Sequence, residues 1–238
     1  MHRMTILAAT LVLVLTFAIT VDAVTLVSDG RPLGKIVLAE HPRHSAWVAA
    51  RHLQQYLRRM SGAVLPVVLS DSRPDGPVAF VGNSPTVRQL VGTFLDAEHL
   101  GYDGFVIKSF DNCLVVAGMD NNFAFDAFAE LGESNGTVFG AFALLEQLGC
   151  RFFNASAVGE HIPKSSTVSV ENLQIVSKPD FVHRRLWLNG NVRPSLTPAR
   201  LKAWQWWYVK NRLGGPHFCH SHNYDDICPA ELLSLIHI

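Results

Sequence analysis

The sequence shows no excess of charge of either sign. Its 20 lysines and arginines are matched by 20 aspartates and glutamates, and no run of lysine and arginine exceeds two residues. Nucleic acids and anionic membranes are bound through positive patches, so the composition argues against both as partners. Hydrophobic residues make up 48% of the chain and charged residues 17%, which is enough apolar material to bury a core. A neutral polar substrate, bound through hydrogen bonds, fits this balance better.

The chain has a single long apolar run, at its N-terminus. Arg3 precedes about 14 largely apolar residues, from about Ile6 to Ile19, and small or apolar residues follow up to Ala23. A membrane-spanning helix needs about 20 apolar residues, so this run is short for an anchor. The layout is typical of a secretory signal peptide, and we expect residues 1–23 to be removed on export. A secreted or periplasmic protein without membrane contact is predicted; an uncleaved anchor is the alternative.

Cysteine is scarce, with four residues in the chain. Cys113 and Cys150 fall in one region, and Cys219 and Cys228 in another. Export makes disulfides possible, and four cysteines allow three pairings. A chain of this size can build a core without them, so bridges within each region and buried free thiols both remain open.

Two amphipathic helices are predicted between residues 24 and 178. The first covers residues 45–62, with Ser45 as its expected cap and Gly62 as its left-handed terminator. The second begins at residue 136 and is stopped by Gly149. The i, i+3, i+4 spacing predicts buried stripes of Ala46, Ala49, Ala50, Leu53, Leu57 and Met60 on the first helix, and of Val138, Ala141, Phe142, Leu145 and Leu148 on the second.

Short runs of β-forming residues predict the strands of a sheet. The residues expected in strands are 36–38, 65–70, 77–82, the two arms of a hairpin over 104–118, 151–153 and 166–175. The bend of the hairpin is expected at Asp111 and Asn112. Strands and helices in this order predict an α+β fold over residues 24–178, a sheet with two helices on one face. Between the hairpin and the second helix, Asp120, Asp126, Glu130 and Glu133 resemble acid/base pairs, but a solvated loop is the simpler interpretation.

The pattern changes after Pro179. Residues 181–191 read as a strand and loop, and a helix follows with Thr197 as its cap and Pro198 at its first position. The aromatic residues of this helix point in different directions, so they cannot form one flat platform. We expect Trp204, Trp206, Trp207 and Tyr208 to pack around the barrel exterior and against the first domain. Strand, loop, helix and a further strand near residues 211–218 would make the first β/α unit of a (β/α)8 barrel.

The residues after Pro179 are too few for a barrel of about 250 residues. The final residues 233–238, LSLIHI, are similar to translated sequencing-adapter sequence, and we interpret them as an artefact. We therefore expect residues 179–232 to be the start of a truncated catalytic barrel. Resequencing the locus would test this interpretation.

Several segments resemble one family. AWVAARHLQQYLRRMSGAVLPVV, GYDGFVIKS, LVVAG and GTVFGAFALLEQLGCRFF resemble the N-terminal domain of family 67 alpha-glucuronidases and the helper domain of beta-hexosaminidases. KPDFVHRRLWLNGN is similar to the linker and first barrel strand that follow there. The resemblance covers about residues 24–231, although the stretch 119–136 is longer than the family's usual connection. It implies an exported glycoside hydrolase without a cofactor, whose two catalytic carboxylates lie on later barrel strands. No catalytic residue is therefore assigned.

The segment PHFCHSHNY at residues 216–224 gathers three histidines and a cysteine. If residues 211–215 belong to the second barrel strand, this segment and the loop at 188–191 lie on the rim where barrel enzymes bind substrates. Imidazoles, amides and an indole suit a sugar, which needs directional hydrogen bonds and an apolar face. The predicted sugar contacts are Trp187, Asn189, Asn191, His220, His222 and Asn223.

Alternatives remain both for the histidine segment and for the whole protein. His217, Cys219, His220 and His222 have the ligand types of a zinc site, but not its usual spacing, and a plain loop is a further interpretation. For the whole protein, a non-catalytic carbohydrate-binding or surface protein with the same fold is the main alternative to an enzyme. A metal-dependent hydrolase is a further alternative.

Overall fold

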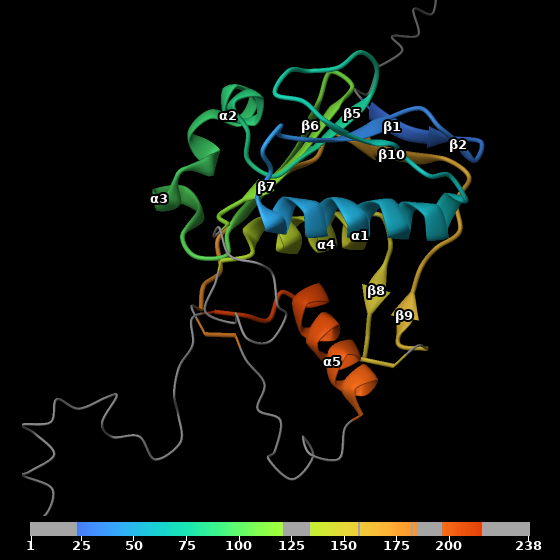
Figure 1. Ribbon diagram of the computed structural model, residues 1–238, viewed down its shortest axis with the longest axis vertical. Helices are drawn as coiled ribbons and strands as arrows, with labels where there is room; N and C mark the ends of the chain where they lie inside the picture. The colour runs from blue at the N-terminus through green and yellow to red at the C-terminus, as the bar shows by residue number, and fades with distance from the viewer. Residues whose placement is uncertain (1–22, 121–133, 157, 182, 185–196, 216–238) are drawn as a thin grey trace, which may run out of the picture.

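The computed structural model describes residues 23–120, 134–156, 158–181, 183–184 and 197–215. A six-stranded sheet in the order β11-β6-β7-β5-β3-β4 forms its centre (Figure 1). The strands are β3 (Lys35–Leu38), β4 (Val67–Leu69), β5 (Val78–Val81), β6 (Phe105–Phe110), β7 (Cys113–Gly118) and β11 (Gln174–Ser177). The strands β4, β3, β5 and β7 pair in parallel, whereas β6 and β11 add antiparallel. The predicted α+β fold is confirmed.

The helices α1 (His44–Ser61) and α4 (Gly136–Gln147) pack together on one face of this sheet, as predicted (Figure 1). Every residue of the predicted α1 stripe is buried, and α4 buries its predicted residues except Leu148, which is partly exposed. Gly62 ends α1 in the left-handed conformation. The expected cap is wrong: Arg43 precedes the helix, and Ser45 lies buried within its first turn.

The opposite face of the sheet is covered by short helices that the sequence pattern did not predict. These are α2 (Pro85–Val91), the 3-10 helix η1 (Gly92–Leu95) and α3 (Ala97–Leu100). Val87, Val91 and Leu95 pack with the sheet residues Phe80 and Val115 in a second core cluster. The start signal of α2 is present, because the Ser84 hydroxyl accepts a hydrogen bond from the amide of Val87. The helix is too short for apolar periodicity to reveal it.

A second, three-stranded sheet corrects two expectations. It contains β10 (Val168–Glu171), β1 (Ala23–Ser28) and β2 (Arg31–Pro32) in that order. The strand β1 was not predicted, and the single strand expected over residues 166–175 is in fact β10 and β11, which belong to different sheets. Asn172, with a φ of 38°, lies in the turn between them. Asparagine tolerates this left-handed conformation better than most residues.

The two cysteines in the described residues are buried free thiols. Cys113 lies in the core cluster under α2 and η1, while Cys150 lies in the cluster under α1 and α4. Because the sheet separates them, a Cys113–Cys150 bridge is excluded. Cys219 and Cys228 lie outside the described residues.

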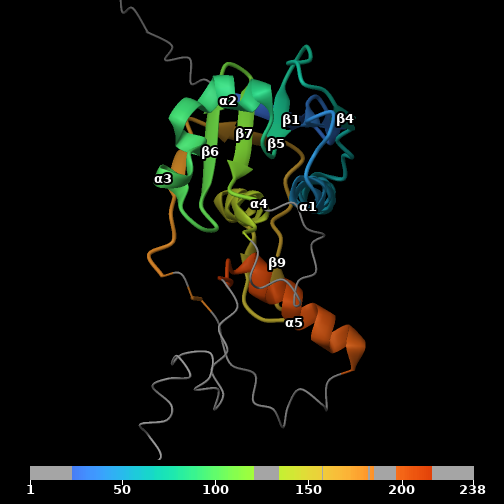
Figure 2. The same ribbon diagram turned by 60° about the vertical axis from the view of Figure 1, so that its left-hand side comes forward.

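The helix α5 (Pro198–Lys210) begins as predicted, with the Thr197 hydroxyl accepting from the amide of Arg200. The layer of α1 and α4 separates α5 from the six-stranded sheet (Figures 1 and 2). Arg184 and Gly214 form an isolated antiparallel bridge, whereas neighbouring barrel strands run parallel. Most residues of the two expected barrel strands lie outside the described ranges, so the barrel remains a prediction. No helix in the described residues is long and apolar enough to cross a membrane.

Candidate functional site

An open groove of about 510 Å³ lies where α5 meets α1 and the two-stranded β8–β9 element (Arg151–Phe152 and Glu160–His161). We call it the α5 groove. Its lining residues are His52, Gln55, Tyr56 and Arg59 of α1, Asn154, Ala155, Ser156 and Glu160 of the β8–β9 element, and Ala203, Trp206, Trp207 and Lys210 of α5. Three segments far apart in the sequence therefore contribute polar and aromatic side chains to one concave surface.

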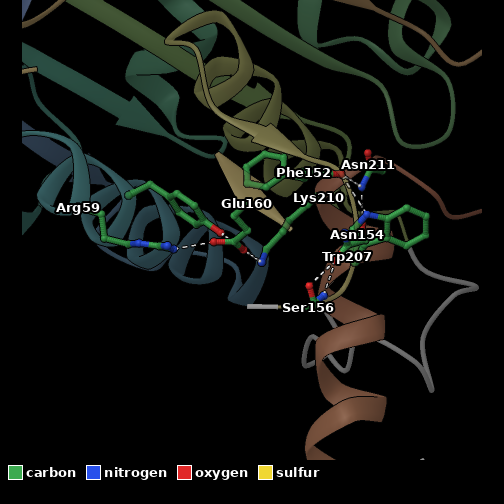
Figure 3. A network of polar contacts seen from close by, with 9 residues as sticks. Arg59, Phe152, Asn154, Ser156, Glu160, Trp207, Lys210 and Asn211 are labelled. Atoms are coloured by element: carbon green, nitrogen blue, oxygen red, sulfur yellow. Dashed lines mark hydrogen bonds and ion pairs between the residues drawn. The ribbon is translucent and has the colours of Figure 1, made fainter. Parts of the chain in front are cut away.

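Glu160 is the charged centre of this groove (Figure 3). Its carboxylate accepts hydrogen bonds from the Tyr56 hydroxyl at 2.9 Å, from Arg59 at 2.7 Å and from the Lys210 ammonium group at 2.5 Å. Tyr56 and Arg59 belong to α1, whereas Lys210 lies in the last turn of α5. Glu160 therefore links α5 to α1.

Burial alone would raise the pKa of Glu160, but the hydrogen bonds from Lys210 and Arg59 outweigh burial and hold the pKa below its usual value. The pKa of Tyr56 is raised, first by burial and then by the negative charge of Glu160. At neutral pH the groove thus contains one carboxylate, two cations and a neutral phenol that donates its proton in a hydrogen bond.

Two aromatic residues of α5 contact the elements that precede it in the chain. Trp207 donates its indole N–H to the carbonyl of Phe152 at 3.0 Å, and Trp206 packs against the core beneath α1. The rings of Trp204 and Trp207 are inclined by 73°, and those of Trp207 and Tyr208 by 78°. These rings do not form one flat surface.

His52 lies at the inner wall of the groove between two aromatic rings. Its ring centroid is 4.3 Å from that of Trp206 and 5.2 Å from that of Phe142. Its Nδ1 atom is buried without a hydrogen-bond partner among the described residues. The pKa of His52 is lowered to about 4, first by burial and then by the positive charges of Lys210 and Arg51, which Glu160 only partly offsets. The imidazole is therefore neutral in the folded protein at pH 7.

This buried histidine predicts a pH dependence of stability. Between pH 6.5 and 4 the unfolded chain binds a proton at His52 and the folded chain does not, so His52 destabilises the fold as the pH falls. We expect His52→Phe to remove up to about 3 kcal/mol of this loss between pH 7.5 and 4. Urea unfolding at both pH values measures it. His99→Gln, at an exposed position, is the control. If wild type and His52→Phe lose the same unfolding free energy between pH 7.5 and 4, the prediction is contradicted.

A second contact holds the segment after Pro179. Asp103 is 1% exposed, and its carboxylate accepts from Arg184 at 2.5 Å and from the amide of Asn135 at 2.8 Å. Arg184 also donates to the carbonyl oxygens of Phe181 and Arg212. Burial raises the pKa of Asp103, although the hydrogen bond from Asn135 and the charge of Arg184 act against it. This ion pair joins the loop before β6 to the start of α4 and to the following segment.

The six predicted sugar contacts, Trp187, Asn189, Asn191, His220, His222 and Asn223, lie outside the described residues and remain predictions. The same holds for Cys219 and His217. Within the described residues, no three His, Cys, Asp or Glu side chains gather in a way that could hold a metal ion.

Asp120 is not part of a solvated loop. It is buried, and its carboxylate accepts from the amide of Thr137 at 2.9 Å and from the Thr137 hydroxyl at 2.5 Å. Burial raises the pKa of Asp120 to about 6 despite these bonds. Because Thr137 lies in the first turn of α4, Asp120 fixes the start of that helix.

Comparison with known proteins shows a similar fold at low sequence identity. No family model matches the sequence, and no curated protein matches it. Among solved structures, a family GH115 4-O-methyl-alpha-glucuronidase with specificity for decorated arabinogalactans aligns with 79% of this chain, at 18% identity and a TM-score of 0.51. The alignment covers 25% of that enzyme, so this chain spans about a quarter of its length.

Two beta-hexosaminidases align less closely. A mutant of the Streptomyces plicatus enzyme, in complex with GlcNAc, matches 68% of this chain at 15% identity with a TM-score of 0.38, over 24% of its own length. The GH20 beta-N-acetylhexosaminidase of Streptomyces coelicolor matches 72% at 16% identity with a TM-score of 0.36, over 28% of its length. Identities this low are evidence of fold alone. The alignment with the GH115 enzyme shows that the described residues share a fold with part of that glycoside hydrolase.

Proposed function

We propose that this chain belongs to an exported glycoside hydrolase that acts on polysaccharides or their oligosaccharides. In this proposal residues 24–178 are an accessory domain of the alpha-glucuronidase N-terminal or hexosaminidase-helper kind, and catalysis takes place on a barrel that begins after Pro179. The observation that carries it is the shared fold with the GH115 enzyme over 79% of the chain. Export rests on the N-terminal residues 1–23.

The role of the accessory domain in this proposal is to position the next domain. Glycosidic bonds are cleaved between two carboxyl groups, one of which must exchange protons with the substrate. Asp103, Asp120 and Glu160 each bind protein groups, and two of them anchor the segment after Pro179. None of them is free to flank a glycosidic bond, which supports a structural role for this domain and catalysis outside it.

The test is hydrolysis by the protein encoded by the complete gene. We expect release of sugar from at least one of three substrate classes: aldouronic acids, nitrophenyl N-acetylhexosaminides, or a panel of plant and microbial glycans. The isolated 238-residue chain is the matched control and should show no turnover. Absence of hydrolysis on every substrate by a folded complete protein would contradict the proposal.

A non-catalytic carbohydrate-binding protein is the second candidate, and the α5 groove favours it. Indoles, amides and hydroxyls line it, as they line sugar sites. Sugar binding without hydrolysis by the complete protein would select this candidate. A metal-dependent hydrolase requires the histidine segment at 216–224; metal analysis with His220→Ala and His222→Ala as controls tests it.

A further inference from the structure

The charge of the α5 groove points to an acidic ligand. Arg59 and Lys210 line the groove as cations, and Glu160 is its only carboxylate among the described lining residues. Because burial keeps His52 neutral, the balance at pH 7 is one positive charge in excess. The Arg59 side chain is 44% exposed and offers five N–H donors, of which Glu160 takes one in the described contacts. The groove can therefore receive a carboxylate in addition to its own.

The remaining lining groups suit a sugar ring. Trp206 and Trp207 line the α5 side of the groove, and an indole surface can cover the C–H face of a pyranose. Gln55, Asn154 and Ser156 are exposed around it and supply both donors and acceptors for hydroxyl groups. Asn154 and Ser156 are held by hydrogen bonds between the Asn154 side-chain oxygen and the Ser156 amide and hydroxyl (Figure 3). This wall of the groove is therefore partly preformed.

We propose that the α5 groove is a binding site for a uronic acid residue. The carboxylate of the sugar pairs with Arg59 and Lys210, the ring lies against one of the α5 indoles, and the hydroxyls bond to Gln55 and Asn154. The inference rests on the proposed function only for the expectation that the protein meets carbohydrate. Bound there, an acidic polysaccharide would cross the junction between the accessory domain and the helix that follows it.

The experiment is titration calorimetry of the full chain with sodium glucuronate at pH 7. We expect a Kd of about 1 mM, typical of a small ligand in an open groove. Methyl glucoside lacks the carboxylate and acetate lacks the ring, so both should bind at least about tenfold more weakly. If glucuronate binds no more strongly than acetate, the sugar ring is not recognised. If methyl glucoside binds as strongly as glucuronate, the carboxylate contributes nothing to binding. Either result overturns the proposal.

Variants of two adjacent arginines locate the site. Arg59→Gln should weaken glucuronate binding about tenfold, because it removes a charged donor from the groove. Arg58→Gln removes the same charge from an exposed neighbour that does not line the groove, and should bind like wild type. Gln55→Ala should weaken binding about threefold without disturbing Glu160. Circular dichroism confirms that each variant is folded, and equal losses in Arg58→Gln and Arg59→Gln would overturn the assignment.

The outcome is independent of the enzyme assay. Binding is measured on this chain, which we expect to have no turnover, whereas hydrolysis is measured on the complete protein. Glucuronate binding without hydrolysis would leave the groove assigned and the proposed enzyme in error. Hydrolysis by the complete protein without glucuronate binding by this chain would support the proposed enzyme and contradict the assignment of the α5 groove.

Discussion

Gly118→Ala is expected to lower the free energy of unfolding by at least about 4 kcal/mol, because three backbone segments cross at this glycine. A Cβ atom at Gly118 would lie 2.4 Å from the carbonyl carbon of Gly136 and 2.6 Å from the carbonyl oxygen of Gly104. The amide of Met119 donates to Gly104, and the amide of Gly136 donates to Met119. Backbone held by these hydrogen bonds cannot move aside for a methyl group as a flexible side chain could.

The control for this change is Gly76→Ala. Gly76 has a φ of +82°, and no atom lies within 4 Å of the place that an added methyl group would take, so alanine there meets backbone strain but no clash. We expect a loss of about 1 kcal/mol at this position. Urea unfolding followed by circular dichroism measures both variants. A Gly118→Ala protein as stable as Gly76→Ala would show that the crossing of β7, α4 and the loop before β6 can widen.

Asp103→Ala is expected to lower the free energy of unfolding by about 3–5 kcal/mol. The substitution leaves the guanidinium of Arg184, whose side chain is 17% exposed, without its carboxylate, and also removes the acceptor for the amide of Asn135. Losing one member of a buried ion pair costs more than the pair contributes, because the remaining charge stays desolvated. The loss should also loosen the segment after Pro179, which Arg184 holds.

Two further variants separate the charge from the backbone. Asp103 has a φ of 62°, which asparagine tolerates, so Asp103→Asn removes the charge without adding left-handed strain and should cost less than alanine. Asp75→Ala, at an exposed position, should change stability by less than about 0.5 kcal/mol. Chemical denaturation gives the three values, and protease cleavage near Arg184 reports local release. Equal stability of Asp103→Ala and Asp75→Ala would contradict a role for the ion pair.

Periodicity was sufficient to predict the helices and strands that bury long apolar faces. The eighteen residues of α1 and the twelve of α4 repeat their apolar residues often enough to define a stripe, and Gly62 and Gly149 mark their ends. The hairpin bends at Asp111 and Asn112, both of which adopt positive φ. Short elements gave no such signal. The helix α2 has only seven residues, too few for an apolar repeat. The strands β10 and β11 are separated at Asn172 because they join different sheets, which is a tertiary feature that the sequence pattern does not contain.

The α5 groove could not be predicted for a different reason. Glu160 lies in a short strand of two residues, and nothing in its neighbours distinguishes it from a solvated glutamate. Its importance comes from Tyr56, Arg59 and Lys210, which the fold brings to it from 101–104 residues earlier in the chain and from 50 residues later. Composition and spacing describe neighbours in sequence, whereas this cluster exists only through tertiary contacts.

The buried thiols of Cys113 and Cys150, on opposite sides of the sheet, can report the opening of the two helical layers separately. Burial raises the pKa of Cys113 and of Cys150 to about 11, so neither is a reactive thiolate while its own layer stays closed. An alkylating reagent would reach Cys113 only when the layer of α2 and η1 unfolds locally. It would reach Cys150 only when the layer of α1 and α4 does so. The order of their modification would therefore reveal which of the two layers gives way first.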